Sequence, residues 1–467
     1  MSSSQLSHGL KVRHLTMMGL GSAIGAGLFV GTGQAISTAG PAVIISYLLA
    51  GAMVIVVMML LAEMAAAMPS SGAFSTYAEK GVGRWAGFAV GWSYWFMLIM
   101  VLGVEILAAT QIISGWFPQI PQWATATTLV LLFAVVNLAG VKNFGEMEFW
   151  FAAIKVGAII AFLVVGVLLV TGVIPGPDGM GLQKLFSGEG GFAPRGLSGI
   201  AAGLLAVMFA FGGIEIITIA AAEATNPSDS IKRATSSIMW RILVFYVGSI
   251  LVMLMVLPWN DPALVEGSFV AVLNVAKIPG AATLMEIVIV VALLSAFNAQ
   301  IYGTSRMAFS LSQRGDGSRA LLKVSKTQVP YVAVLVSVFF ALVAVGLNAL
   351  DSQGSVMGIL LDAVGATLLI IWAFIALAQI RMRPGLEASG RLKLRTVWHP
   401  YLGIGAIGAI GAFSILMLFD PVGRRNLLIT LGIFAIIVGI YFARQAIYGK
   451  DSDHLKGDRL NMDDAVG

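Results

Sequence analysis

Long apolar stretches separated by short polar segments occupy almost the whole chain. Most of them are long enough to cross a hydrocarbon core of about 30 Å as a single helix. Two stretches exceed 30 residues, so we expect the corresponding helices to tilt strongly or to project from the membrane. The twelve predicted spans are Leu15 to Ala39, Ala42 to Met68, Gly83 to Phe117, Ala124 to Val141, Phe149 to Thr171, Leu197 to Glu223, Ser236 to Trp259, Ala281 to Ser312, Val332 to Leu347, Val356 to Ile380, Tyr401 to Phe419 and Leu427 to Tyr448.

The composition supports a membrane protein. Of the 467 residues, 58% are hydrophobic and 11% are charged, whereas an ordinary soluble domain is roughly 45 to 50% apolar and about 25% charged. A soluble core could not hide this excess without leaving large apolar patches in water. We therefore predict an all-α integral membrane protein with the lipid bilayer around it, and soluble enzymes become poor candidates.

The basic residues predict the orientation, because Lys and Arg in short loops favour the cytoplasmic side. With the N-terminus inside, 22 of them fall in cytoplasmic segments and five on the other side, and Lys155 lies within a span. Both termini are thus predicted to be cytoplasmic, with an N-terminal segment at 1–14 and a tail at 449–467. The net charge of +5 is then explained mostly by the basic residues of the cytoplasmic loops, and no nucleic-acid partner is needed to account for it.

The reactive side chains exclude several kinds of chemistry. There is no cysteine, so disulfides, thiolate metal sites and cysteine nucleophiles are absent. The four histidines, His8, His14, His399 and His454, do not form a metal motif. We expect no metal and no cofactor. The polar start of the chain leads into an apolar run without a small-residue cleavage site, so we also expect the first span to be retained.

Two spans contain glycine clusters that can interrupt a helix. The first carries Gly21-Ser-Ala-Ile-Gly-Ala-Gly27, and the sixth carries Phe209-Ala-Phe-Gly-Gly-Ile-Glu215. Each glycine weakens a helix by about 1 kcal/mol relative to alanine. Close helix packing is the alternative for the first cluster alone. Because interrupted spans lie five apart, the pair predicts an inverted-repeat transporter whose opened backbone binds a small charged solute.

Charged residues within spans are costly and require a reason. Lys155 lies about seven residues into the fifth predicted span and is the preferred proton carrier, although a structural ion pair or a lysine reaching the interface remains possible. Glu105 and Glu215 are candidates to receive a substrate ammonium group or a proton, with a merely hydrogen-bonded carboxyl as the alternative. Asn298 and Asp362 are weaker candidates for lining the cavity.

Further residues are placed by their position in the spans. Phe209, Phe211 and Trp95 are candidates to shape a side-chain pocket, although packing is the commoner role of such aromatics. Capping or loop pairing is the preferred interpretation for acidic residues near predicted span ends, which are Glu63, Glu146, Glu148 and Glu223.

Several motifs together resemble one known family. They are Gly21-Ser-Ala-Ile-Gly-Ala-Gly-Leu-Phe29, Ala39-Gly-Pro41, Gly145-Glu-Met-Glu-Phe-Trp-Phe151 with Lys155, Phe211-Gly-Gly-Ile-Glu215, Ala222-Glu223 and Thr304-Ser-Arg-Met307. They look like the amino acid transporter family of bacterial permeases, within the amino acid, polyamine and organocation superfamily. The likeness runs from about residue 9 to residue 445. It is strongest to permeases for aromatic amino acids, with 4-aminobutyrate (GABA) and proline permeases close behind.

The resemblance implies a fold with five-plus-five inverted repeats, at about 15–172 and 197–380, and two extra helices at about 401–448. These would form one transporter domain at 15–448, in which spans one and six are broken. The backbone around five residues of span one would hold the substrate carboxylate: Ser22, Ala23, Gly25, Ala26 and Gly27. The unwound stretch from Phe209 to Glu215, which includes Phe211 and Gly212, would meet the amino group and side chain.

The sequence thus predicts a proton and amino acid symporter of the inner membrane that works by alternating access, with Lys155 as the titrating amine. Its substrate is predicted to be a neutral amino acid of the aromatic class, and GABA or proline transport remains the alternative. An exchanger is the nearest functional rival. A channel is disfavoured because the chain shows no repeated polar rings. A membrane enzyme is disfavoured because there is no cysteine and the histidines lie at or near the ends of the apolar runs.

Overall fold

The computed structural model describes residues 17, 24–70, 72–220, 227–351 and 356–448. Every regular element in this part of the chain is a helix. By length and composition, nine of the described helices could cross a membrane, and shorter apolar helices lie among them. The all-α membrane fold is therefore confirmed, whereas the count of twelve spans and the repeat boundaries stay predictions.

Half of the predicted stretches coincide closely with helices of the structure. These are α4 (Val43–Ala67), α6 (Arg84–Trp116), α7 (Gln122–Ala139), α14 (Ala281–Gln313), α15 (Tyr331–Leu350) and α17 (Tyr401–Phe419). Others extend beyond the apolar run: α8 (Val141–Val170), α12 (Pro227–Val256), α16 (Val356–Ala388) and α18 (Pro421–Tyr448). These helices are longer than their apolar runs because a run of hydrophobic residues marks only the part of a helix inside the membrane. The helical hydrogen bonds continue through polar helix formers such as Glu, Lys and Arg.

Two of the predicted spans are divided into shorter pieces. The described part of the first consists of α2 (Ala26–Phe29) and α3 (Gly31–Ala39), and the sixth consists of α10 (Gly196–Ala210) and α11 (Ile216–Ala220). The connecting segments hold the remaining short helices, which are η1 (Gly40–Ala42), α5 (Ala73–Gly81), α9 (Lys184–Ser187), α13 (Pro262–Ala276) and η3 (Arg319–Leu322).

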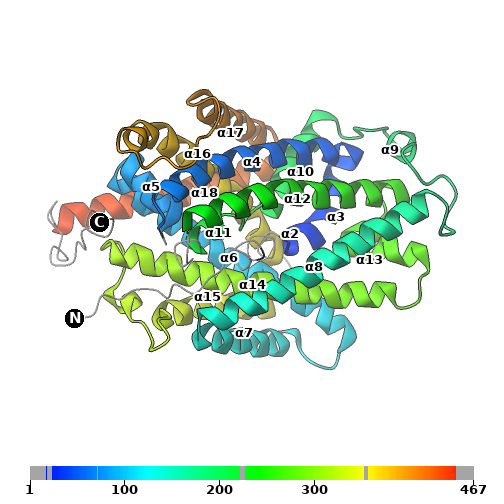
Figure 1. Ribbon diagram of the computed structural model, residues 1–467. Helices are drawn as coiled ribbons and strands as arrows, with labels where there is room; N and C mark the ends of the chain where they lie inside the picture. Colours follow the sequence, from blue (N-terminus) through cyan, green and yellow to red (C-terminus); the bar gives the residue numbers. More distant parts are fainter. Residues whose placement is uncertain (1–16, 18–23, 71, 221–226, 352–355, 449–467) are drawn as a thin grey trace.

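The centre of the bundle is formed by α6 and α14, which pack along each other (Figure 1). Each has 33 residues, a length of about 50 Å at 1.5 Å per residue. That exceeds the hydrocarbon thickness, in agreement with the predicted tilt or projection. The broken helices lie against this centre, because α2 contacts α6 and α11 contacts α14, while α10 packs on α3 and α4.

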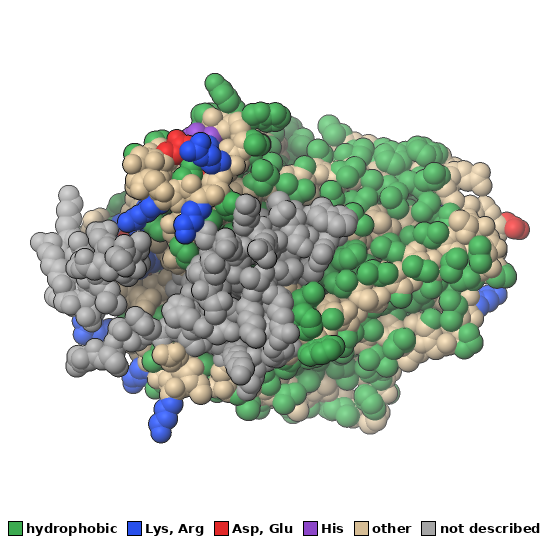
Figure 2. Space-filling view, viewed as in Figure 1, with side chains coloured by type: hydrophobic (Ala, Val, Ile, Leu, Met, Phe, Trp, Pro, Cys, Tyr) green, Lys and Arg blue, Asp and Glu red, His purple; other side chains and the backbone are tan. Residues whose placement is uncertain are grey.

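The outer surface is apolar over a broad belt, and most Lys and Arg visible in Figure 2 lie toward one end of the molecule. The same end carries the end of α18 in Figure 1. Large apolar side chains such as Leu131 and Val135 of α7 and Phe339 of α15 are exposed, as expected of a surface that faces lipid. We call the end with Arg444 the basic end.

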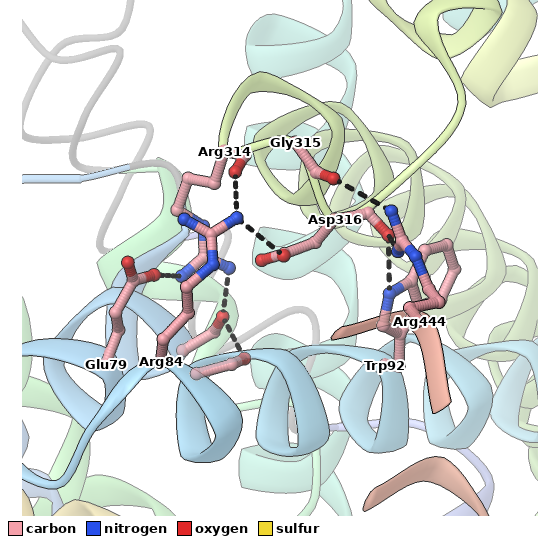
Figure 3. Close-up of polar contacts among 9 residues, drawn as sticks. Glu79, Arg84, Trp92, Arg314, Gly315, Asp316 and Arg444 are labelled. Carbon is pink, nitrogen blue, oxygen red and sulfur yellow. Dashed lines mark hydrogen bonds and ion pairs between the residues drawn. The ribbon is translucent and has the colours of Figure 1, made fainter. Parts of the chain in front are cut away.

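An ion cluster ties four elements together at the basic end (Figure 3). Arg84 of α6 donates to the carbonyl of Arg314 at 2.9 Å and lies 3.3 Å from Asp316 Oδ1. Arg314 donates to Glu79 of α5 at 2.8 Å, and Arg444 of α18 donates to the Asp316 carbonyl at 3.0 Å. Burial raises the pKa of Asp316 to about 6 despite the nearby arginines. The cluster joins α18 and α5 to the central helix pair.

Candidate functional site at the broken helices

The break between α10 and α11 is stabilised by side chains that satisfy its backbone. Gly213 has φ of +97°, a conformation that favours glycine. The Glu215 carboxylate accepts from the Gly213 amide at 3.0 Å and from Trp372 Nε1 at 2.7 Å. Tyr246 donates its hydroxyl to the Ala210 carbonyl at 2.7 Å. Backbone that leaves the helix inside a membrane must find hydrogen-bond partners in the protein. Glu215 supplies such a partner and thereby stabilises the break.

The described part of span one begins with non-helical backbone at Gly25, whose φ and ψ are −139° and −145°. The next amide, that of Ala26, donates to both carboxylate oxygens of Glu105 at 3.1 Å each. The Glu105 side chain is 3% exposed and comes from the middle of α6. A carboxylate is favoured here because the first amides of a helix lack intrahelical acceptors and carry partial positive charge.

Glycine lets the two broken helices touch. A Cβ atom at Gly27 would lie 2.4 Å from the Ala210 Cα atom, and one at Gly25 would meet the Glu105 carboxylate. In both cases the added Cβ would be closer to its neighbour than ordinary van der Waals contact allows. The two predicted interruptions therefore meet in space, and the absence of side chains at Gly25 and Gly27 makes that contact possible.

A small central pocket lies where the breaks and α6 converge. It is lined by Gly25, Gly27, Val101, Glu105, Phe209, Ala210, Gly212 and Gln300. Its volume of about 10 Å³ is that of a single water position. Five predicted site residues are thus brought together: Gly25, Gly27, Glu105, Phe209 and Gly212. Ala26 adjoins them through its amide.

The sequence reasoning did not find Gln300, which lies on α14 and is 1% exposed. Its Oε1 atom is buried and has no hydrogen-bond partner in the described part of the chain. A glutamine in the middle of a predicted span is the signal that could have identified it, because burying an unpaired amide is costly.

Lys155 lies in a second polar group next to the pocket. It is fully buried on α8 and interacts electrostatically with Glu148 and then with Glu105. Ser295 donates to Glu148 at 2.8 Å. Capping or loop pairing was the preferred interpretation for Glu148, but α8 begins at Val141, so Glu148 lies two turns inside the helix. The structure thus surrounds Lys155 with two carboxylates.

The remaining predicted residues lie elsewhere. Asn298 accepts a hydrogen bond from Asn137 at 2.8 Å and also interacts with the Glu148 carboxylate, so it belongs to the polar group around Lys155 and not to the central pocket. The Phe211 ring packs against Tyr246 and Tyr47, with ring centroids 5.1 and 6.1 Å apart. Trp95 packs against Trp92 and Phe340. Ser22, Ala23 and Glu223 lie outside the described residues, as does the side chain of Asp362.

A larger cavity of about 250 Å³ also has Phe209 in its lining. It is lined by residues of α3, α10, α16 and the junction of α17 with α18, including Gln34, Asp420 and Asn426. Since α18 spans 28 residues, or about 42 Å, the cavity at its start is at the opposite end from Arg444. Phe209 lines both spaces.

Known proteins match the chain over nearly its full length. The family model described as Amino acid permease matches residues 14–455. The Aromatic amino acid transport protein AroP of Corynebacterium glutamicum is 49% identical over 446 residues, which cover 94% of this chain and 96% of that protein. A Probable GABA permease of Pseudomonas aeruginosa is 43% identical over 446 residues (95% and 94%), and the Gamma-aminobutyric acid permease of Bacillus subtilis is 42% identical over 451 residues (96% and 95%).

The helical fold and these matches define a multi-pass membrane transporter and not an enzyme. The chain belongs to the amino acid permease family, so the family resemblance is confirmed. A permease of this family transports an amino acid. The central pocket, with its backbone amide, carboxylate and glycines, is the candidate site for that substrate.

Proposed function

We propose that this protein is a proton-coupled symporter that imports a neutral amino acid of the aromatic class across the inner membrane by alternating access. Both termini are cytoplasmic in this proposal, so the basic end faces the cytoplasm. The observation that carries the proposal is the contact between the Ala26 amide and the Glu105 carboxylate, close to buried Lys155. In this proposal the Ala26 amide, which can bind a carboxylate, lies close to Lys155, which carries the transported proton.

The contact suggests how the amino acid is bound. The Ala26 amide is the kind of group that binds a substrate carboxylate, and Glu105 occupies it. The central pocket of about 10 Å³ has no room for an amino acid while the Glu105 side chain fills it. In our proposal the substrate carboxylate therefore displaces Glu105. The displaced carboxylate turns toward the substrate ammonium group or takes a proton.

Lys155 couples this exchange to the proton. Its ammonium group is balanced by Glu148 and Glu105, and the balance changes when Glu105 leaves the Ala26 amide. Protonated Lys155 accompanies substrate loading from outside, and its deprotonation on the cytoplasmic side accompanies release. Only the proton's charge need cross with a zwitterionic substrate, so a membrane potential contributes about 2.3 kcal/mol per elementary charge per 100 mV.

The test is uptake by purified protein in proteoliposomes with and without an imposed proton gradient. Wild-type protein should accumulate labelled phenylalanine above the external concentration only with the gradient. Lys155→Ala should abolish accumulation but retain some binding, whereas Lys326→Ala, which removes an exposed lysine, should accumulate normally. Full uphill uptake by Lys155→Ala would contradict the assignment of the proton carrier.

Two alternatives can be distinguished by experiment, and the first of them has specific support. Two relatives are named as GABA permeases at 43% and 42% identity, so competition of labelled phenylalanine uptake by GABA and by proline decides the substrate. Strong competition by GABA alone would replace the aromatic assignment. An exchanger would show counterflow without a proton gradient and no net accumulation when one is imposed.

A further inference from the structure

The segment that leads from α16 into α17 lies at the basic end of the molecule. Helix α17 ends at Phe419 and α18 begins at Pro421, and the two helices pack against each other. The start of α17 is therefore at the same end as Arg444. Figure 2 shows Lys and Arg side chains gathered at this end. We call residues 391–401 the basic strap.

The basic strap exposes three positive charges. Arg391, Lys393 and Arg395 are exposed, and they alternate with Leu392 and Leu394, which are partly buried. The Leu394 side chain packs against the hydrophobic core. Within the described part of the chain, none of the three basic side chains makes a hydrogen bond or an ion pair. All three charges are therefore available to an anionic partner.

Buried contacts hold the basic strap in place. The Thr396 amide donates to the Glu63 carboxylate, and the Thr396 carbonyl accepts from Arg383 at 2.7 Å. Arg383 and Glu63 form an ion pair at 3.4 Å, and Gln379 donates to Glu63 at 2.7 Å. A segment fixed in this way loses less conformational entropy when a partner binds than a flexible loop would.

Large apolar side chains stand beside the three charges. Val397, Trp398 and Tyr401 are 57%, 79% and 76% exposed, and Tyr401 is the first residue of the membrane-spanning helix α17. Trp and Tyr at the end of a span typically lie at the level of the lipid headgroups. This position favours lipid over a soluble acidic partner, because a bilayer reaches both the rings and the charges at once.

We propose that the basic strap is a docking surface for anionic phospholipids of the cytoplasmic leaflet. Arg391, Lys393 and Arg395 contact the negatively charged headgroups, while Trp398 and Tyr401 lie in the interfacial layer. The choice of leaflet follows from the proposed topology, but the surface takes no part in binding the transported amino acid. Each basic residue at an anionic membrane surface raises the affinity about fivefold, so the strap selects anionic over zwitterionic lipid.

The test measures which lipid touches Trp398. The purified full-length protein is reconstituted into vesicles in which either phosphatidylglycerol or phosphatidylcholine carries bromine, which quenches tryptophan fluorescence on contact. The contribution of Trp398 is the part of the quenching that Trp398→Phe removes. In this part, phosphatidylglycerol should be preferred over phosphatidylcholine by at least about fivefold. High salt should weaken the preference, because it screens exposed charges.

Two double variants locate the effect. Arg391→Gln/Lys393→Gln removes two charges of the basic strap, so the preference should fall below about twofold. Lys323→Gln/Lys326→Gln is the matched control, because it removes two exposed charges from the segment between α14 and α15. It should keep the wild-type preference. Both variants change exposed side chains and should keep the wild-type unfolding midpoint in detergent.

Several outcomes would overturn the proposal. Equal quenching of Trp398 by the two lipids would do so, as would a preference that survives in Arg391→Gln/Lys393→Gln. A preference lost equally in the Lys323→Gln/Lys326→Gln control would assign it to overall charge and not to the strap. Competition by free inorganic phosphate at constant ionic strength would identify a soluble anion as the ligand. The symport proposal can fail or hold without changing these results, because no transport is measured.

Discussion

Replacing Gly27 by alanine should separate the two broken helices. The added Cβ would lie 2.4 Å from the Ala210 Cα atom and 3.1 Å from its Cβ. Since ordinary contacts begin near 3.4 Å, the backbones must move apart by about 1 Å. Overpacking of this kind costs about 1–3 kcal/mol, which corresponds to a roughly 5- to 150-fold change in an equilibrium. Alanine's better helix propensity, about 1 kcal/mol, offsets only part of this.

The assay is the kcat/KM of amino acid uptake in proteoliposomes, together with the thermal unfolding midpoint of the purified protein in detergent. We expect Gly27→Ala to lose at least fivefold in kcat/KM. Gly346→Ala is the matched control, because a Cβ there has no atom within 4 Å and the glycine is also inside a helix, α15. If Gly27→Ala transported as well as Gly346→Ala, close contact of the broken helices would not be needed for the site.

Two predictions concern buried polar groups. Trp372→Phe removes a hydrogen-bond donor to buried Glu215 and should lower the free energy of unfolding by about 1–3 kcal/mol. Thermal melts measure the effect, with Trp398→Phe as a control at an exposed site. Equal melting points of the two variants would contradict a structural role for Glu215. Asp316 has its pKa raised from 3.8 to about 6, so its folded form holds the proton longer and its stabilising contribution is lost as pH rises from about 4 to 6. Asp316→Asn should flatten that part of the melting-point curve, and an unchanged slope would show that Asp316 does not titrate in this range.

Local pattern was sufficient for the helices and for the two breaks. Apolar runs predicted α6, α14 and α17 to within one or two residues, because helices inside a membrane consist of long apolar stretches that end at polar residues, and both features are visible in the sequence. The double glycine at Gly212 predicted the end of α10 for an equally local reason. The polar start of α8 was missed, since hydrophobicity reports lipid contact and not the extent of hydrogen bonding.

The partners of the polar side chains were decided only by the tertiary structure. Glu105 was identified as a site residue from its place in a span, but its bond to the Ala26 amide, 79 residues away, depends on how α6 crosses α2. Glu148 and Gln300 gained their environments in the same way. A sequence shows that a buried charge or amide needs a partner. Which partner it meets is determined by helix packing, where shifts of about 1 Å select among groups of similar chemistry.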